Sequence, residues 1–402
     1  MATGQQLTSL AKELAERGHR VTVLTSDRGY DDPSLRFQRR ESWQGITIIR
    51  IPSVALGKTK KWQRALNFGS FLVLCAFRLL LLPRYDVVVA LTSPPLISLI
   101  GTLFVKLKGG RFFLWMMDLN PDEAIVAGWL KADSTPTRVL QRLLRFSLKN
   151  AERVIVLDRF MKERVRGKGV PEEQIAIVPP WALDDTIQFD EAGRRTFRAQ
   201  QELTDKFVVM YSGNHSPCHP LDTLLEAAQS LSKSADIVFC FVGGGSEQAK
   251  VQAFIALHSL RNIRCLPYQP LEHLSASLSA ADLHVIVMGE SFPGIVHPCK
   301  IYNILSVGTP FLYIGPDESP IADIVAESNR RQAYAASHGD VQTVVQCIGQ
   351  ARSNGSYRTP QSRQQKYSKG QILPKLLELF ESEPNGASSE NVATMMAKHA
   401  KA

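Results

Sequence analysis

The chain has 402 residues, of which 44% are hydrophobic and 21% charged, and its formal net charge is +9. This length favours two domains over one, and the composition is typical of a soluble globular protein. The positive charge predicts attraction to a membrane surface, a nucleic acid or a phosphorylated substrate. Nucleic acid is disfavoured, because the sequence has no zinc-finger spacing, aromatic RNA-binding signature or dense basic tract.

Helices and strands are expected to alternate through the first half of the chain. Residues 5–17 have apolar positions at helical spacing, and Gly18 ends this helix. Strands, some running into turns, are expected at 19–26, 86–96, 111–124, 151–158 and 174–181. These runs are β-branched and almost continuously apolar, which predicts parallel strands covered by helices on both faces.

One apolar segment, Leu66–Leu82, resembles a membrane span but contains Arg78. A span needs roughly 20 mostly apolar residues, and a central arginine costs about 3 kcal/mol. A helix packed on the first sheet is therefore favoured. Lys58, Lys60, Lys61, Trp62 and Arg64 precede the segment, a composition typical of interfacial helices. Peripheral contact of residues 58–83 with a membrane surface therefore stays open.

The polar stretch from Asp184 to Lys206 predicts a linker, after which the alternation restarts. The expected elements of the second half are 206–213, 221–233, 236–245, 251–260, 262–268, 276–288, a helix near Lys300, and 311–315. Two such arrays predict an α/β protein with two doubly wound, Rossmann-like domains facing each other across a cleft. We place the N-terminal domain at 1–185, the C-terminal domain at 186–360, a crossover helix within 361–384 and a flexible tail at 385–402.

The stretch from Glu290 to Pro310 carries the clearest chemical signal. A loop with Gly294 leads through His297 to Lys300, at the expected start of a helix that ends at Gly308. Unpaired backbone N–H groups and the helix dipole favour an anion at a helix start. A lysine in the first turn adds a full positive charge, so the pattern predicts a diphosphate site. The alternative is a solvated lysine without a ligand.

The six cysteines are scattered along the chain without a C-x-x-C pair. They predict free thiols in a reducing, cytoplasmic compartment, and no zinc site.

Several short motifs indicate the family of the protein. They are MDLNPDEAIVAGWLK (117–131), VIVLDRFMKERV (154–165), IVPPW (177–181), YSGN (211–214), FVGGG (241–245) and HPCKIYNILSVGTP (297–310). In this order and spacing, over residues 2–380, they resemble the retaining glycosyltransferases of family 4. These enzymes have the GT-B fold, and the WbuB-like branch of bacterial surface-polysaccharide assembly is the most similar.

The resemblance implies transfer of a hexose from a UDP- or GDP-linked sugar to a hydroxyl, with retained configuration and without a metal or other cofactor. The nucleotide-sugar donor would lie on the C-terminal domain, and a lipid-linked or glycan acceptor on the N-terminal domain at the inner membrane face. The implied catalytic residues are Asp118, Glu123 and Lys300. The implied donor-binding residues are Gly4, Gly213, Asn214, His215, His219, Gly243, Gly244, Tyr268, Gly294, His297, Lys300 and Asn303.

Several of these residues have simpler explanations. His215 and His219 lie beside prolines and would serve equally as turn residues, and Asp118 suits a turn or helix N-cap. A triple glycine is also common as a plain strand-to-helix turn. Asn303 stands where many family members have a glutamate that contacts the donor ribose, and an asparagine offers a hydrogen bond without charge.

The family's opening β-strand has no counterpart, because Met1 falls where its glycine-rich loop is expected. A sheet without that strand would expose unpaired backbone, so we expect a longer natural chain or poor folding. Three other functions stay open: a sugar-nucleotide epimerase with the same fold, a non-catalytic sugar-nucleotide-binding protein, and a peripheral membrane scaffold.

Overall fold

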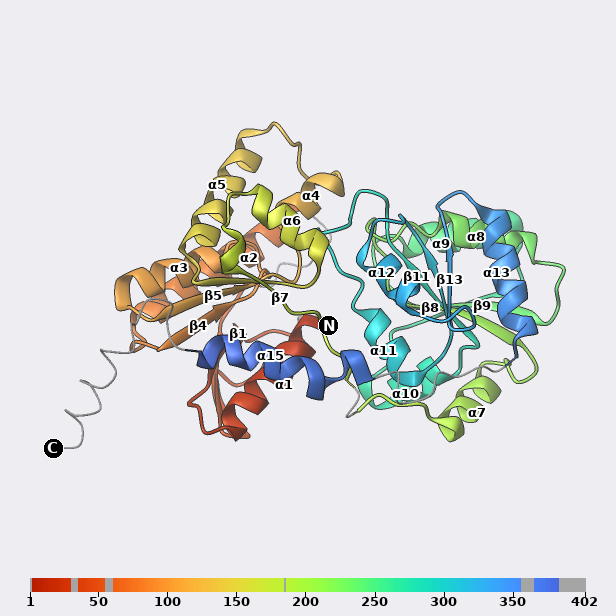
Figure 1. Cartoon of the computed structure of the whole chain (residues 1–402), viewed down its shortest axis with the longest axis horizontal. Helices are drawn as coiled ribbons and strands as arrows, with labels where there is room; N and C mark the ends of the chain where they lie inside the picture. Colours follow the sequence, from red (N-terminus) through yellow and green to blue (C-terminus); the bar gives the residue numbers. More distant parts are fainter. Residues whose placement is uncertain (1, 30–34, 55–60, 184–185, 356–364, 383–402) are drawn as a thin grey trace.

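The computed structural model describes residues 2–29, 35–54, 61–183, 186–355 and 365–382. The expected tail at 385–402 lies outside the described residues, as do Lys58 and Lys60 of the basic segment. Two α/β domains lie side by side, with the N-terminal domain on the left of Figure 1 and the C-terminal domain on the right.

The N-terminal domain contains two separate sheets. The first has the order β1-β3-β2, where β1 (Thr22–Ser26) runs parallel and β2 (Arg40–Trp43) antiparallel to β3 (Ile46–Ile51). Neither β2 nor β3 was among the strands expected from the sequence, and β2 adds an antiparallel pair beside the parallel ones. The second sheet is parallel, in the order β4 (Val87–Ala90), β5 (Arg111–Trp115), β6 (Arg153–Val156) and β7 (Ile175–Ile177). Among the described strands none pairs with the open edges of β1 and β4, where the resemblance would place the family's first strand.

Six α-helices accompany these strands: α1 (Ala2–Glu16), α2 (Lys61–Leu80), α3 (Ile97–Lys108), α4 (Asp122–Val126), α5 (Thr135–Asn150) and α6 (Arg159–Gly167), with a short 3₁₀ turn at Glu172–Gln174. Local chemistry sets their ends: the side chains of Ser134 and Asp158 cap α5 and α6 by accepting hydrogen bonds from backbone N–H groups. Gly4, expected in a loop, lies in the first turn of α1. A Cβ there would meet nothing within 4 Å, so no close approach requires glycine. Among the described helices, none is long and apolar enough to cross a bilayer.

The C-terminal domain has one six-stranded parallel sheet in the order β10-β9-β8-β11-β12-β13. Its strands are β8 (Phe207–Asn214), β9 (Ile237–Gly244), β10 (Ile263–Leu266), β11 (Leu283–Val287), β12 (Phe311–Ile314) and β13 (Ala333–Ala336). Its helices are α7 (Glu191–Gln200), α8 (Asp222–Ser230), α9 (Gln248–His258), α10 (Leu271–Ser279), α11 (Lys300–Val307), α12 (Pro320–Glu327) and α13 (Val341–Ser353). The central strands β9, β11 and β12 are buried along their whole length, as continuous apolar runs predict for a doubly wound sheet.

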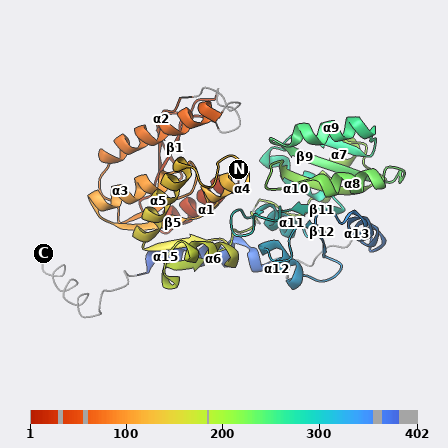
Figure 2. The same ribbon diagram turned by 90° about the horizontal axis from the view of Figure 1, so that it is seen from above.

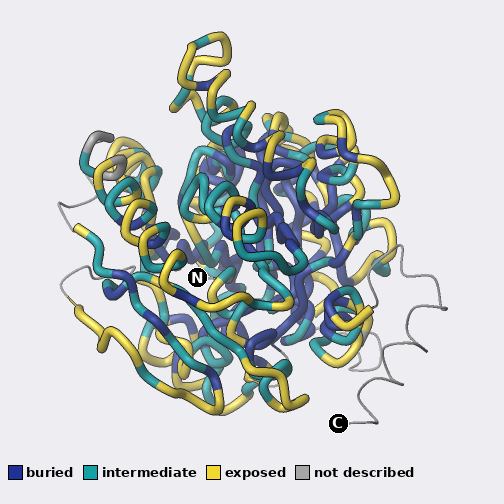
Figure 3. Tube along the Cα trace, turned by 90° about the vertical axis from the view of Figure 1, so that its left-hand side faces the viewer, coloured by how far each residue is buried: buried dark blue, intermediate teal, exposed yellow. Residues whose placement is uncertain are grey.

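The last helix of the described residues, α15 (Lys369–Glu381), follows a 3₁₀ turn at Gln365–Tyr367 and packs on the N-terminal domain beside α1 (Figure 1). The Phe380 ring lies edge-on to Phe113 of β5 at 4.9 Å, and its carbonyl accepts from Arg111 Nη1 at 2.9 Å. One buried apolar cluster continues from β5 and β6 into α11 and α15. In Figure 3, which looks onto the N-terminal domain, buried segments run through the interior and the outer turns are exposed. The two domains therefore share a core.

Candidate functional site

Lys300 begins α11 and turns inward at the carboxyl end of β8. Its ammonium lies 3.6 Å from the ring centroid of Tyr211, a cation–π contact. A Cβ at Gly213 would lie only 2.9 Å from Nζ, so any side chain at that position would displace the ammonium. Gly213 has φ +142°, a conformation that other residues rarely adopt. The strand end and the lysine therefore fit each other closely.

The Lys300 ammonium is a buried cation without a counter-ion. Within the described part of the chain, Nζ has no hydrogen-bond partner and is shielded from solvent. Burial lowers the pKa of Lys300 from 10.5 to about 7. An unpaired buried charge is costly unless a ligand neutralises it, so the arrangement indicates a site for an anion.

Two histidines stand close to this ammonium and stay neutral. Burial, with a smaller contribution from the Lys300 charge, lowers the pKa of His219 to about 3. Burial likewise lowers the pKa of His215, whose ring is almost fully buried. His219 Nδ1 binds the Val287 carbonyl at 2.7 Å, whereas His215 Nδ1 has no partner among the described residues. The anion site therefore combines one cation with neutral hydrogen-bonding groups.

The glycines that end β9 form a second wall beside Gly213. A Cβ at Gly243 would lie 2.2 Å from the Gly213 carbonyl oxygen, so the two strand ends touch through backbone. The half-exposed ring of Tyr268 covers these glycines, and its hydroxyl donates to the Gly244 carbonyl at 2.8 Å. The same hydroxyl lies 3.5 Å from Asn214 Oδ1. These expected donor-binding residues lie next to the Lys300 site.

Asp118 and Glu123 reach the domain junction from the N-terminal domain. Burial, with a smaller contribution from the Glu123 charge, raises the pKa of Asp118 to about 7. Burial also raises the pKa of Glu123, which accepts from Asn120 Nδ2 at 3.3 Å and from the Cys218 thiol at 3.9 Å. Because Cys218 belongs to the loop after β8, this contact joins the two acidic residues to the C-terminal domain near Lys300.

Replacing Asp118 by asparagine is expected to stabilise the protein at neutral and higher pH. The folded pKa of about 7 lies above the ordinary aspartate pKa of 3.8, so the folded state binds more protons between these values. Wild-type stability therefore falls as the pH rises towards 7. The unfolding temperature of Asp118→Asn should match wild type near pH ~4 and exceed it at pH ~8. Asp133→Asn, an exposed loop control, should show no such divergence, and equal pH profiles for all three proteins would contradict the assignment.

His297 and Gly294 join the domains, which differs from the role expected for them. The Asp158 carboxylate accepts from His297 Nδ1 at 2.8 Å, and the Tyr302 hydroxyl donates to Nε2 at 2.7 Å. Both ring nitrogens are therefore occupied and neither is left for a phosphate. Gly294, at φ +73°, lies against the start of α6, where a Cβ would be 2.6 Å from the Phe160 carbonyl carbon and oxygen. Close backbone packing, rather than a ligand, explains this glycine.

Asn303 faces the interdomain linker. Its Oδ1 accepts from the Leu183 backbone N–H at 3.4 Å. The Asn303 side chain thus binds the backbone at the point where the polypeptide leaves the N-terminal domain. The expected contact of Asn303 with a donor ribose stays a prediction.

Three residues of this region were absent from the expected set: Tyr211, Asp158 and Cys218. Asp158 lies two residues after the end of β6, so the rule that ligands bind at the carboxyl ends of strands would have included it. Tyr211 precedes Gly213 by two residues on β8, which places both side-chain positions on one face of the strand. The partner of Cys218 depends on domain packing and has no local signal.

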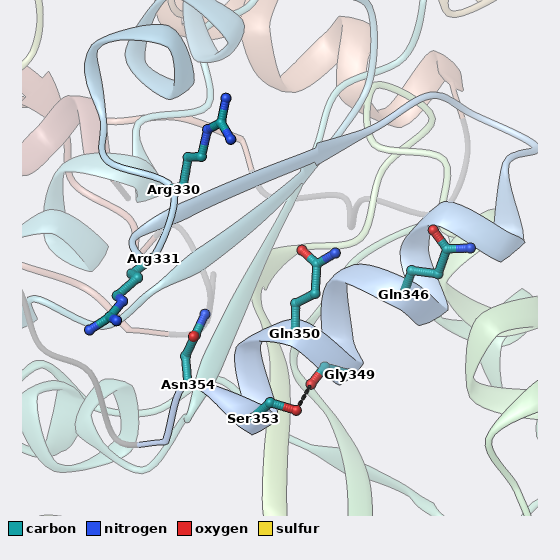
Figure 4. Close-up of a pocket in the computed structure, with 7 residues that line it drawn as sticks. All are labelled: Arg330, Arg331, Gln346, Gly349, Gln350, Ser353 and Asn354. Atoms are coloured by element: carbon teal, nitrogen blue, oxygen red, sulfur yellow. Dashed lines mark hydrogen bonds between the residues drawn. The ribbon is translucent and has the colours of Figure 1, made fainter.

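Two surface cavities lie near the amino ends of the C-terminal strands, whereas Lys300 lies at their carboxyl ends. The first is lined by Arg330, Arg331, Gln346, Gly349, Gln350, Ser353 and Asn354. Figure 4 shows these residues on the segment before β13 and on the last turns of α13. The second includes Phe207 and Asp236, at the amino ends of β8 and β9. Neither cavity includes the Lys300 site, and among the described residues no cluster of three metal-ligating side chains occurs.

Two family profiles together span nearly all of both domains. Residues 2–181 match the glycosyl transferase 4-like domain, and residues 193–366 match the glycosyl transferases of group 1. The chain is a family 4 glycosyltransferase. Such a glycosyltransferase joins an N-terminal and a C-terminal α/β domain, and here the boundary between the two profiles falls in the linker that Asn303 contacts.

Known proteins similar to this glycosyltransferase include a curated relative and two solved structures. The putative colanic acid biosynthesis glycosyl transferase WcaI of Escherichia coli (strain K12) is 29% identical over 325 residues, 76% of this chain and 77% of the relative. Sucrose-phosphate synthase from Thermosynechococcus elongatus has a TM-score of 0.69 at 16% identity, covering 93% of this chain and 91% of that one. Anabaena HepE in complex with UDP and glucose has a TM-score of 0.69 at 14% identity, covering 94% and 95%. Both solved structures support the GT-B fold.

Proposed function

We propose that this glycosyltransferase moves a hexose from a UDP- or GDP-linked sugar to a hydroxyl acceptor, with retained anomeric configuration and without a metal. The observation that carries the proposal is the buried, unpartnered Lys300 ammonium at the end of β8. A diphosphate would supply the missing counter-charge. HepE of Anabaena, which has the same fold, was crystallised with UDP and glucose, and this supports a nucleotide donor.

The residues around Lys300 suggest separate roles for the two domains. As the bond between the anomeric carbon and the diphosphate oxygen breaks, negative charge grows on the leaving group. Lys300 and the amides at the start of α11 would stabilise that charge in a site shielded from water. In a front-face reaction the acceptor oxygen bonds to the anomeric carbon on the same side, and the leaving phosphate oxygen takes the acceptor proton. Asp118 and Glu123 would orient the acceptor from the N-terminal domain.

The biological role proposed is assembly of an exopolysaccharide, O-antigen or other glycoconjugate. The similarity to a relative named for colanic acid biosynthesis supports this role. A lipid-linked or glycan acceptor at the inner face of the plasma membrane would suit the net charge of +9 and the apolar helix α2 within residues 58–83.

A two-stage experiment tests the proposal and its two rivals. UDP and GDP are first compared by thermal shift, and the matching nucleotide sugars are then incubated with and without saccharide acceptors. Transfer should release nucleotide only when an acceptor is present, and it should persist in EDTA. The product should have the same anomeric configuration as the donor sugar, as measured by NMR. Nucleotide released without acceptor would favour the epimerase, and binding without turnover would favour the non-catalytic protein. No thermal shift with either nucleotide would overturn the proposal.

A further inference from the structure

Three neighbouring helices of the N-terminal domain form a surface with an unusual composition. We name α2, α3 and α5 the α2–α3–α5 face, since α3 packs against both of the others. None of these three helices, Lys61–Leu80, Ile97–Lys108 and Thr135–Asn150, contains an Asp or a Glu. Figure 2 shows α2 and α3 along the outside of the N-terminal domain. A surface free of carboxylates over three helices differs from the mixed charge usual on a globular protein.

Apolar side chains point outward from two of these helices at helical spacing. On α2, Leu66, Val73, Phe77 and Leu80 are exposed, Phe77 by 63%. On α3, Leu103 and Leu107 are exposed by 51% and 64%. Because residues separated by three, four or seven positions lie on one side of a helix, each set forms a stripe. Contiguous exposed apolar stripes mark a contact with another apolar phase.

Basic side chains accompany the stripes. The described ones are Arg78, Lys106, Lys108, Arg138, Arg142, Arg145 and Lys149. The Lys106 ammonium lies 5.6 Å from the ring centroid of Phe146, which joins α3 to α5. Among the described residues, none of these seven forms an ion pair, whereas Arg111 and Lys168 elsewhere in the domain each bind a carboxylate. The charge of the face is therefore available to an anionic partner.

We propose that the α2–α3–α5 face docks on a lipid bilayer that contains anionic phospholipids. The apolar stripes would enter the boundary between headgroups and acyl chains, and the basic residues would contact phosphates. The proposal rests on the proposed function only in its consequence for the acceptor. Thr92, in the turn before α3, accepts from the Asp118 backbone N–H at 3.2 Å. The face therefore leads to the acceptor side of the site, where a lipid-linked substrate would arrive from the bilayer.

The charge of the face argues against a second copy of this chain as the occupant. A twofold dimer would bring the same surface of two copies together. Seven unpaired cations would then meet seven others, with no carboxylate on the three helices to compensate. An anionic bilayer supplies the complementary charge together with an apolar phase.

Co-sedimentation of the full chain with vesicles tests the proposal. The protein should bind vesicles of phosphatidylglycerol mixed with phosphatidylcholine, and bind pure phosphatidylcholine weakly. The pair Arg142→Glu and Arg145→Glu should weaken binding to the anionic vesicles roughly tenfold or more, as should Leu103→Glu with Leu107→Glu. The matched control is Arg330→Glu with Arg331→Glu, two exposed arginines of the C-terminal domain, and it should bind like wild type.

A second readout separates this proposal from the function itself. UDP or GDP binding should be unchanged in the surface variants, and Lys300→Met should still bind vesicles. Equal vesicle binding by the α2–α3–α5 variants and the control would overturn the proposal, even if sugar transfer is confirmed. So would a dimer in sedimentation velocity that the leucine pair dissociates, because a second copy would then cover the face.

Discussion

Replacing Lys300 with methionine is expected to abolish sugar transfer while raising the thermal stability of the free enzyme. The methionine keeps most of the apolar stem that packs on Tyr211 and removes the unpaired charge. Without the ammonium, the leaving diphosphate loses its cation, and kcat/KM should fall by about 10³-fold, the scale measured for a lost electrostatic donor in a buried site. The same deletion removes a desolvated charge from the unliganded protein, so its unfolding temperature should rise by several degrees.

The pH dependence follows from the direction of the pKa shift. The folded pKa of Lys300, about 7, lies below the ordinary lysine pKa of 10.5, so the unfolded state binds more protons between these values. Wild-type stability should therefore rise as the pH increases from about 7 towards 10, and Lys300→Met should lose this rise. Binding of the donor requires the protonated lysine. Its affinity should fall by up to tenfold per pH unit above about 7 in wild type.

Calorimetric titration with the active nucleotide sugar and thermal unfolding over the same pH range measure both effects. Lys250→Met is the matched control, because Lys250 is an exposed helical lysine on α9 that binds Asp222 at the surface. It should leave donor affinity and turnover unchanged. A Lys300→Met enzyme that keeps wild-type turnover, or one that is less stable than wild type at neutral pH, would contradict the role assigned to this ammonium.

Local sequence rules were sufficient to single out Lys300 and Gly213, the centre of the proposed anion site. Lys300 at a helix start and Gly213 at a strand end follow from sequence patterns that act over a few residues, and the structure places them in contact. His297 follows the same pattern and was assigned to the ligand, yet its nitrogens bind Asp158 and Tyr302. A residue 139 positions away decides its role. The sequence gives no sign of that pairing, because it depends on how the two domains pack.

The elements that were not expected have identifiable causes. The strand β3, ITIIRI, is a β-branched apolar run, so its signal was present in the sequence. The strand β13, AYAA, has four residues, three of them alanine, a residue depleted in strands. In contrast, α5 has apolar residues at helical spacing and a Ser134 cap followed by proline, so its signal was present in the sequence. The antiparallel strand β2 is mostly exposed and polar, and its pairing follows from the tight turn to β3 rather than from hydrophobicity.

Removing the Asp158 side chain is expected to weaken the alignment of the two domains and to slow transfer about 100-fold, the scale of a misplacement of about 1 Å at a reacting centre. Asp158 has two roles in the structure. Its Oδ1 caps α6 by accepting from the Met161 backbone N–H at 2.8 Å, and its Oδ2 binds His297 of the other domain at 2.8 Å. Asp158→Ala would lose the cap, which costs about 1 kcal/mol. It would also leave the buried Nδ1–H of His297 without an acceptor, which costs about 1–3 kcal/mol more.

A second helix cap separates these two effects. Asp340 caps α13 by accepting from the Thr343 backbone N–H at 3.0 Å and contacts no residue of the N-terminal domain among its described hydrogen bonds. Asp340→Ala should therefore lower the free energy of unfolding by the cap contribution alone, with kcat unchanged. Asp158→Asn keeps a good capping residue and lets His297 pair through its other tautomer, so it should retain most activity.

The decisive measurement compares kcat and KM across these three variants. Loss of the Asp158 contact should lower kcat more than it raises KM for the donor. Lys300 follows His297 by three residues on the same segment of the C-terminal domain, so the ammonium stays in place for the donor. The N-terminal domain, however, loses its alignment with Lys300. Asp158→Ala with wild-type kcat and a stability loss equal to that of Asp340→Ala would mean that the contact is only a cap. The alignment of the two substrates would then have to come from the shared core and α15 instead.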